Sequence, residues 1–273
     1  MCQLAGTDTG FKIDLGAILS MGYQQNLCSV SSVAVWLCVQ FVTFSLVMPF
    51  RAQSLEVSVT FPPTDKRGAP ARTVGTGQRT TEACLRGKYP YVTALTPSNN
   101  VVTTVSTNPT LFWYFPRTKL KSARLIVLDA QNKKLVYQTT LALGDTPGVV
   151  KVNLPKSVSL ETGKNYLWNL FVVCNPAKVA DDLVVQGWLE RTELSSEQKT
   201  KLAQAQDPLK QAEVYAEAKI WQETLMILAQ LQQERPNDAK VTDAWKELLN
   251  SVGLSAIATE PVVECCTVEP SPK

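Results

Sequence analysis

The chain has 273 residues, 45% of them hydrophobic and 19% charged, which is typical of a globular protein that buries a core. Lys and Arg total 27 against 24 Asp and Glu, and this net charge of +3 is too small to predict a nucleic-acid partner. The sequence contains no histidine, the usual general base and a common metal ligand. Ser-His-Asp and Cys-His catalysis and most zinc sites are therefore excluded, and we expect no enzyme activity and no cofactor.

Residues 1–52 are interpreted as an export leader. No charged residue occurs between Asp14 and Arg51, and the apolar run in this interval has about the length of a signal-peptide core. Cleavage after Ala52 would place the mature protein in the periplasm or outside the cell. The alternative is an uncleaved membrane anchor, because residues 27–50 are also long enough to span a bilayer. Only in that case do we expect contact with a membrane.

The region 53–191 is predicted to form a β-sandwich domain. It opens with an expected strand at 55–61, followed at 62–79 by a loop rich in proline, glycine and basic residues. The basic side chains of this loop are candidate contacts for an anion, and a solvated surface loop is the alternative. They are Lys66, Arg67, Arg72 and Arg79.

Short strands at regular spacing are predicted for the rest of this domain. Their ranges are 110–115, 123–129, 135–141, 150–154, 166–174 and 182–190. The pattern preceding Tyr166 is similar to the tyrosine corner of immunoglobulin-like and fibronectin-type sandwiches, in which the tyrosine hydroxyl bonds to backbone just upstream. The predicted fold is mainly β with α: an immunoglobulin- or fibronectin-like antiparallel β-sandwich, then a small α-helical region.

The hydrophobic period changes to that of helices over residues 193–255. The spacing of small, aromatic and proline positions is similar to that of a tetratricopeptide repeat. A single repeat cannot bury both of its faces, so the helices either pack on the sandwich or leave an apolar face for a partner. We expect Tyr215, Trp221 and Trp245 to form this partner-docking face. Residues 256–273 are expected to be a flexible tail.

Four of the seven cysteines follow the leader: Cys84, Cys174, Cys265 and Cys266. In an oxidising compartment we predict a disulfide between Cys84 and Cys174, which closes a long loop and contributes roughly 2–4 kcal/mol. The role of the adjacent pair Cys265 and Cys266 stays open.

Taken together, these features resemble a bacterial family known from cyanobacteria and catalogued as domain of unknown function 928. The resemblance is carried by residues 67–70, 75–79, 95–97, 109–116, 166–174, 186–191, 215–221, 235–238 and 251–254. It implies export and the same two-part architecture, and it implies no catalytic residues.

The leading hypothesis is a non-catalytic binding or scaffold protein of the cell envelope, with an unidentified protein partner on the helices. The rival is a hydrolase that acts on envelope polysaccharide through carboxylates, for which the candidates are Asp181, Asp182, Glu190 and Glu193. A third possibility is a membrane-anchored accessory or sensor subunit, which requires that the leader is retained.

Overall fold

A computed structural model of the chain describes residues 58–65, 91–117, 120–144, 147–263 and 268–269. The predicted leader lies outside these ranges, and so do several residues named above: Lys66, Arg67, Arg72, Arg79, Cys84, Cys265 and Cys266. What was predicted for them stays a prediction. Within the described ranges, every helix is too short or too polar to cross a lipid bilayer.

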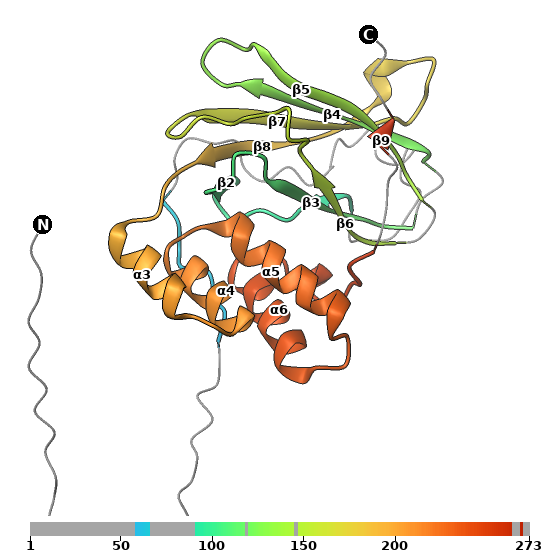
Figure 1. Ribbon diagram of the computed structural model, residues 1–273. Helices are drawn as coiled ribbons and strands as arrows, with labels where there is room; N and C mark the ends of the chain where they lie inside the picture. Colours follow the sequence, from blue (N-terminus) through green and yellow to red (C-terminus); the bar gives the residue numbers. More distant parts are fainter. Residues whose placement is uncertain (1–57, 66–90, 118–119, 145–146, 264–267, 270–273) are drawn as a thin grey trace, which may run out of the picture. The chain divides into compact units, whose positions relative to one another are not determined.

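Two β-sheets form the strand-rich part of the protein (Figure 1). The larger sheet has the order β2-β8-β7-β4-β5-β9, with bounds Val101–Thr104, Leu183–Arg191, Asn165–Val172, Ser122–Asp129, Leu135–Ala142 and Val268–Glu269. The smaller sheet has the order β1-β3-β6, with bounds Thr93–Ala94, Thr110–Phe115 and Gly148–Asn153. The strands predicted at 123–129 and 135–141 are confirmed, and they form an antiparallel hairpin of β4 and β5.

One pairing differs from the prediction of an antiparallel sandwich. β2 runs parallel to β8, so the larger sheet is mixed. The two strands are far apart in sequence, and a parallel pair needs a long connection between its members. Here that connection contains β3, the hairpin of β4 and β5, β6 and β7.

Four helices follow the strands in the described part of the chain: α3 (Ser196–Gln204), α4 (Pro208–Glu217), α5 (Trp221–Glu234) and α6 (Ala239–Ser251). Local sequence explains their ends. Ser195 and Gln198 form a capping box, and Asp207 caps α4 with proline at its first position. After α6 the chain turns at Gly253, whose φ of 76° favours glycine.

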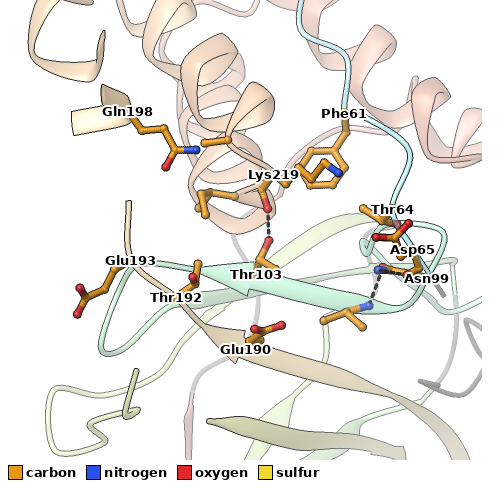
Figure 2. Close-up of a pocket in the computed structure, with 13 residues that line it drawn as sticks. Phe61, Thr64, Asp65, Asn99, Thr103, Glu190, Thr192, Glu193, Gln198 and Lys219 are labelled. Atoms are coloured by element: carbon orange, nitrogen blue, oxygen red, sulfur yellow. Dashed lines mark hydrogen bonds between the residues drawn. The ribbon is translucent and has the colours of Figure 1, made fainter. Parts of the chain in front are cut away.

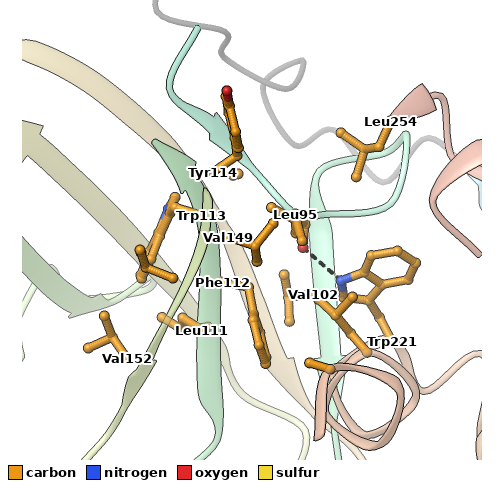
Figure 3. Packing of buried hydrophobic residues seen from close by; sticks show 14 of the residues in the cluster. Leu95, Val102, Leu111, Phe112, Trp113, Tyr114, Val149, Val152, Trp221 and Leu254 are labelled. Atoms are coloured by element: carbon orange, nitrogen blue, oxygen red, sulfur yellow. Dashed lines mark hydrogen bonds between the residues drawn. The ribbon is translucent and has the colours of Figure 1, made fainter. Parts of the chain in front are cut away.

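The strands and the helices share one hydrophobic core. Trp113 on β3 meets Trp168 on β7 edge to face, with ring centroids 5.6 Å apart, which packs the two sheets together. On its other side the smaller sheet faces the helices (Figure 1). There the indole N–H of Trp221 donates a hydrogen bond to the Leu95 carbonyl at 2.8 Å (Figure 3). The helices are thus a third layer of the same folded body.

This packing corrects the prediction of an aromatic docking face. Trp221 is 0% exposed and Trp245 is 2% exposed, so neither indole is available to a partner. Tyr215 on α4 is half-buried. The helical periodicity was predicted correctly, but the apolar face that it produces is buried inside the protein.

Both ends of the described chain also differ from expectation. Residues 58–61 are extended but do not form the predicted strand; Val59 and Phe61 are buried, and the Phe61 N–H donates to the Ser251 Oγ at 3.0 Å. The start of the expected flexible tail is ordered against the sheets. Its Ile257 is buried, and the Val263 N–H donates to the Val149 carbonyl at 2.9 Å.

Candidate functional site: a pocket at the edge of β2

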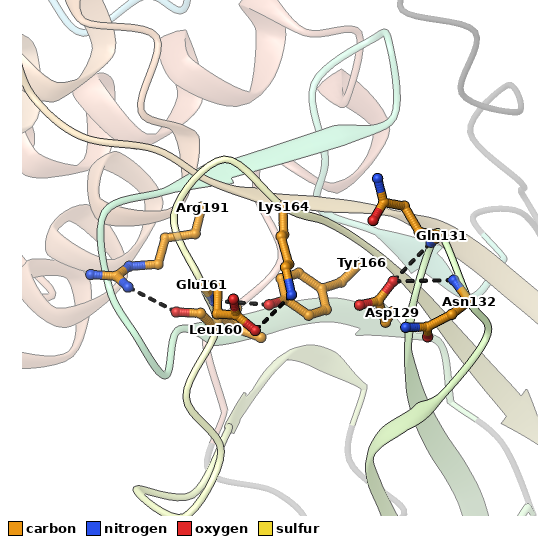
Figure 4. Close-up of polar contacts among 8 residues, drawn as sticks. All are labelled: Asp129, Gln131, Asn132, Leu160, Glu161, Lys164, Tyr166 and Arg191. Carbon is orange, nitrogen blue, oxygen red and sulfur yellow. Dashed lines mark hydrogen bonds and ion pairs between the residues drawn. The ribbon is translucent and has the colours of Figure 1, made fainter.

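A network of hydrogen bonds fixes the end of β8, where the pocket begins (Figure 4). The Tyr166 hydroxyl accepts the backbone N–H of Glu161 at 2.8 Å, which is the upstream bond predicted from the sequence. The Arg191 guanidinium donates to the Leu160 carbonyl at 2.8 Å, and Gly163 N–H donates to the Arg191 carbonyl at 2.7 Å. The turn before β7 therefore holds the last residues of β8 in place.

A pocket of about 220 Å³ lies where these last residues of β8 and the edge of β2 meet the helices (Figure 2). Three kinds of segment line it: the extended chain at 61–65, the strands β2 and β8 with their flanking residues, and the helical region at α3 and the α4–α5 turn. The lining residues are Phe61, Thr64, Asp65, Asn99, Val101, Thr103, Glu190, Thr192, Glu193, Gln198, Ala218, Lys219 and Ile220.

The edge of β2 exposes backbone groups to this pocket. In the parallel ladder the Trp188 N–H donates to the Asn100 carbonyl and the Thr192 N–H donates to the Thr104 carbonyl. Alternate residues of a strand point their peptide groups to opposite edges, so those of Val101 and Thr103 face away from β8. The Val101 N–H is accepted by the Asn99 side chain at 3.1 Å. Among the described residues, no hydrogen bond uses the Thr103 N–H, the Thr103 carbonyl or the Val101 carbonyl.

The α4–α5 turn is fastened to the same strand. The Thr103 hydroxyl donates to the Lys219 carbonyl at 2.5 Å and accepts the Trp221 N–H at 3.0 Å (Figure 2). Lys219 itself has a φ of 60°, which lets the chain reverse between the two helices. These contacts keep the helical wall of the pocket in a fixed position relative to the strand.

Among the described residues that line the pocket, the acidic ones are Asp65, Glu190 and Glu193, and the basic one is Lys219. The Glu193 Oε1 accepts the Thr162 hydroxyl at 3.4 Å. The described part of the chain has no cluster of three or more carboxylate or thiol side chains arranged to hold a metal ion. As far as the structure describes it, the pocket thus combines strand-edge groups that no described residue bonds to, apolar side chains such as Phe61 and Ile220, and acidic residues.

A comparison with protein families identifies the relatives of this chain. A family model described as Domain of Unknown Function (DUF928) matches residues 74–262, which is more than half of the chain. The chain belongs to the DUF928 family. This confirms the resemblance noted in the sequence, and the match includes every lining residue of the pocket except those at 61–65. No curated protein and no solved structure matches the chain significantly.

A buried carboxylate supports β2 in this DUF928 protein from the core side. Glu223 Oε1 accepts the Thr104 hydroxyl at 2.7 Å and the N–H groups of Val105 and Ser106, each at 3.1 Å. Burial raises the pKa of Glu223 above its ordinary value, although these hydrogen bonds act in the opposite direction. Burial and the nearby Glu223 charge also raise the pKa of Tyr215. Glu223 thus connects α5 to the turn that follows β2.

The predicted carboxylate candidates separate into two groups. Asp181 pairs with Lys178 at 3.0 Å, and Asp182, whose side chain is 2% exposed, pairs with Arg124 at 2.8 Å. Glu190 and Glu193 instead line the pocket. Asp65 and Thr103 were not predicted, because only the fold brings their segments together.

The structure describes one of the two cysteines of the predicted disulfide. Cys174 follows β7 and is partly buried, where its Sγ lies 3.5 Å from the Val172 carbonyl oxygen. Cys84 lies outside the described residues, so the pairing of Cys84 with Cys174 stays a prediction.

Proposed function

We propose that this DUF928 protein is an exported, non-catalytic binding or scaffold protein of the cell envelope, and that the pocket at β2 is its binding site. The observation that supports this proposal is that one pocket joins the acidic residues Asp65, Glu190 and Glu193 to the edge of β2, where no described residue bonds to the Thr103 N–H or carbonyl. Strand edges and fixed charges recognise a partner through hydrogen bonds and electrostatic complementarity. The hydrophobic segment before Arg51 supports export.

The finer description of the fold belongs to the same proposal. We treat the two sheets as a variant of the immunoglobulin-like sandwich, on the strength of the tyrosine-corner bond at Tyr166. We treat α4 and α5 as a single tetratricopeptide-like pair that has become part of the core. The basic loop with Lys66, Arg67, Arg72 and Arg79 remains a candidate second contact, for an anionic group.

The test is in-cell cross-linking of the tagged full-length protein, with bound proteins identified by mass spectrometry. Deleting the helices is unsuitable because it would expose the core, so the comparison uses the double variant Glu190→Gln with Glu193→Gln. The control is Glu197→Gln, since Glu197 lies on α3 outside the pocket and pairs only with Lys201 on its own helix. A partner captured by the wild type and the control, and lost with the double variant, supports the proposal. The same proteins in all three samples would contradict it.

Export is tested separately by sequencing the amino terminus of the protein recovered from cells. A mature chain that begins at Gln53 supports cleavage after Ala52 and an envelope location. A chain that retains residues 27–50 supports the alternative of a membrane-anchored accessory or sensor subunit.

A second candidate function is a carboxylate-dependent hydrolase of envelope polysaccharide. It is favoured by one observation, that Glu190 and Glu193 line the same pocket. Such enzymes hold an acid and a second carboxylate about 5–10 Å apart. The purified protein would then release reducing ends from envelope polysaccharide, and either single Glu→Gln substitution would abolish the release. No release by the wild-type protein rejects this candidate.

A further inference from the structure

We propose that the outer face of the larger sheet, centred on Asn169, packs against the same face of a second copy of this chain and forms a two-fold dimer. The outer face is the side of β5, β4, β7 and β8 that is turned away from the smaller sheet. The described helices and the smaller sheet all lie on the other side of these strands (Figure 1). The inference concerns residues that do not line the pocket, so it does not depend on the proposed function.

The register of the strands places an unbroken apolar row across this face. Leu128 on β4 pairs with Leu135 on β5 and with Leu167 on β7, and Leu167 pairs with Trp188 on β8. All four side chains are at least partly exposed, and Leu135 is 52% exposed. In the described part of the chain, none of the four belongs to the hydrophobic core or packs against it. Contiguous apolar surface outside the core of a protein marks an interaction site.

A second row on the same face adds apolar surface without net charge. Phe171 on β7 pairs with Arg124 on β4 and with Val184 on β8, and Val184 is 38% exposed. The Arg124 guanidinium lies 5.6 Å from the centroid of the Phe171 ring and donates to the Asp182 carboxylate at 2.8 Å. This ion pair leaves the row neutral. Two copies can therefore approach face to face without repulsion between like charges.

Between the two rows lies a carboxamide that selects the partner. Asn169 is 9% exposed, and no hydrogen bond within the described part of the chain uses its side chain. Its cross-strand neighbours are Ile126 and Gln186. A buried amide favours a ligand that offers both a donor and an acceptor, and a second Asn169 offers both. A two-fold axis along β7 places the two carboxamides opposite each other and each row against the same row of the second copy.

The area of the face is sufficient for a specific dimer. The strands β4, β5 and β7 have 8 residues each and β8 has 9. Eight residues extend about 27 Å, and four neighbouring strands span about 19 Å. The flat area is thus about 500 Å² per copy and about 1,000 Å² for two copies, and the accessible area of the side chains is larger. Specific interfaces bury at least about 1,000 Å² in total.

The test measures the oligomeric state by sedimentation velocity between about 1 μM and about 1 mM protein, with the mature chain as isolated from cells. Leu167→Lys and Leu167→Glu place a charge next to the axis and are measured separately and as an equal mixture. Their control is Met226→Lys, because Met226 is 42% exposed on α5. Asn169→Asp is compared with Asn250→Asp, because Asn250 is exposed on α6.

We expect the wild-type protein to change from monomer to dimer within this range of concentration. Leu167→Lys, Leu167→Glu and Asn169→Asp should each weaken dimerisation at least about tenfold, since each substitution occurs twice in a two-fold interface. The two control variants should dimerise like the wild type. The mixture of Leu167→Lys and Leu167→Glu should dimerise more tightly than either variant alone, because the opposite charges meet across the axis.

Three results would overturn the inference. The first is a wild-type protein that stays monomeric up to about 1 mM. The second is dimerisation that Leu167→Lys and Asn169→Asp leave unchanged, because another surface would then form the dimer. The third is a mixture of the two Leu167 variants that dimerises no better than either alone, because an axis along β7 requires these residues to meet. Association regained on mixing would also show that the single variants are folded.

Discussion

Replacing Trp221 by alanine should bring the whole protein close to unfolding. The indole is fully buried, meets Phe61 edge to face at 5.0 Å between ring centroids, and donates to the Leu95 carbonyl at 2.8 Å. Removing a buried tryptophan side chain costs about 3–5 kcal/mol, a large part of the roughly 5–15 kcal/mol that stabilises a typical protein. Trp221→Phe keeps a ring but leaves the Leu95 carbonyl without its donor, so a smaller loss of about 1–3 kcal/mol is expected.

Urea denaturation followed by two signals measures this effect. Far-ultraviolet circular dichroism at 222 nm follows mainly the helices. Tryptophan fluorescence, measured in a Trp245→Phe background, follows mainly the sheets through Trp113, Trp168 and Trp188. Because the helices and sheets share one core, both transitions should move together to lower urea. The control is Met226→Ala on the same helix, where the side chain is 42% exposed and little change is expected.

Two outcomes would refute this reasoning. An unchanged midpoint for Trp221→Ala would mean that the indole does not contribute to the core. Loss of the helical signal alone, with the fluorescence transition in place, would mean that the helices fold as a separate unit. That outcome would support the prediction from the sequence that the helices form a docking region for a partner.

Three further substitutions and one control test other parts of the fold. Burial raises the pKa of Glu223 in the folded state above its ordinary value of 4.5, so the folded protein binds this proton more tightly and the unfolding free energy should fall as pH rises through the folded-state pKa. Glu223→Gln should remove this part of the pH dependence; an identical pH profile for wild type and variant would contradict it. Gly187→Ala would place a methyl group 2.4 Å from the Trp168 ring, so a loss of about 1–3 kcal/mol is expected by thermal melting. Gly144→Ala, with nothing within 4 Å, should melt like the wild type, and equal melting of both variants would reject the steric argument. Tyr166→Phe removes one hydrogen bond to backbone and should cost about 0.5–1.5 kcal/mol in urea denaturation, whereas no change would mean that the bond contributes nothing.

Sequence patterns predicted the elements that depend on interactions between residues close together in the chain. The caps at Ser195 and Asp207 follow from side chains that reach backbone N–H groups two or three residues away. The hairpin of β4 and β5 follows from alternation on either side of a polar turn, and the alternate residues of β7 are buried as expected. The hydrogen bond from the Glu161 N–H to the Tyr166 hydroxyl is also short-range, since the two residues are five positions apart.

Contacts between residues far apart in the sequence could not be predicted in this way. Nothing in the short apolar run of β2 specifies a parallel neighbour, because the choice is made by which strand edge is left open after β7 and β8 pair. Glu223 reads as an ordinary polar residue in a helix. Its burial depends on the position of the turn after Thr104, which only the assembled fold determines.

The incorrect prediction for Trp221 and Trp245 has a simple physical origin. Periodicity shows that a helix has an apolar face, but it does not show what covers that face. In the same way, the sequence does not show which segments come together to form the pocket. Glu190 and Glu193 were noted in the sequence as a pair, yet Asp65 and the free edge at Thr103 join them only through folding.

The position of α5 against the strands also has a consequence for the synthesis of this protein. A nascent chain that stops before residue 221 contains β1 to β8 but lacks the helix that covers the smaller sheet. Its apolar side chains would stay in contact with water, and such intermediates are prone to aggregate. Premature termination or proteolysis between β8 and α5 therefore yields a substrate for degradation and not a smaller stable domain.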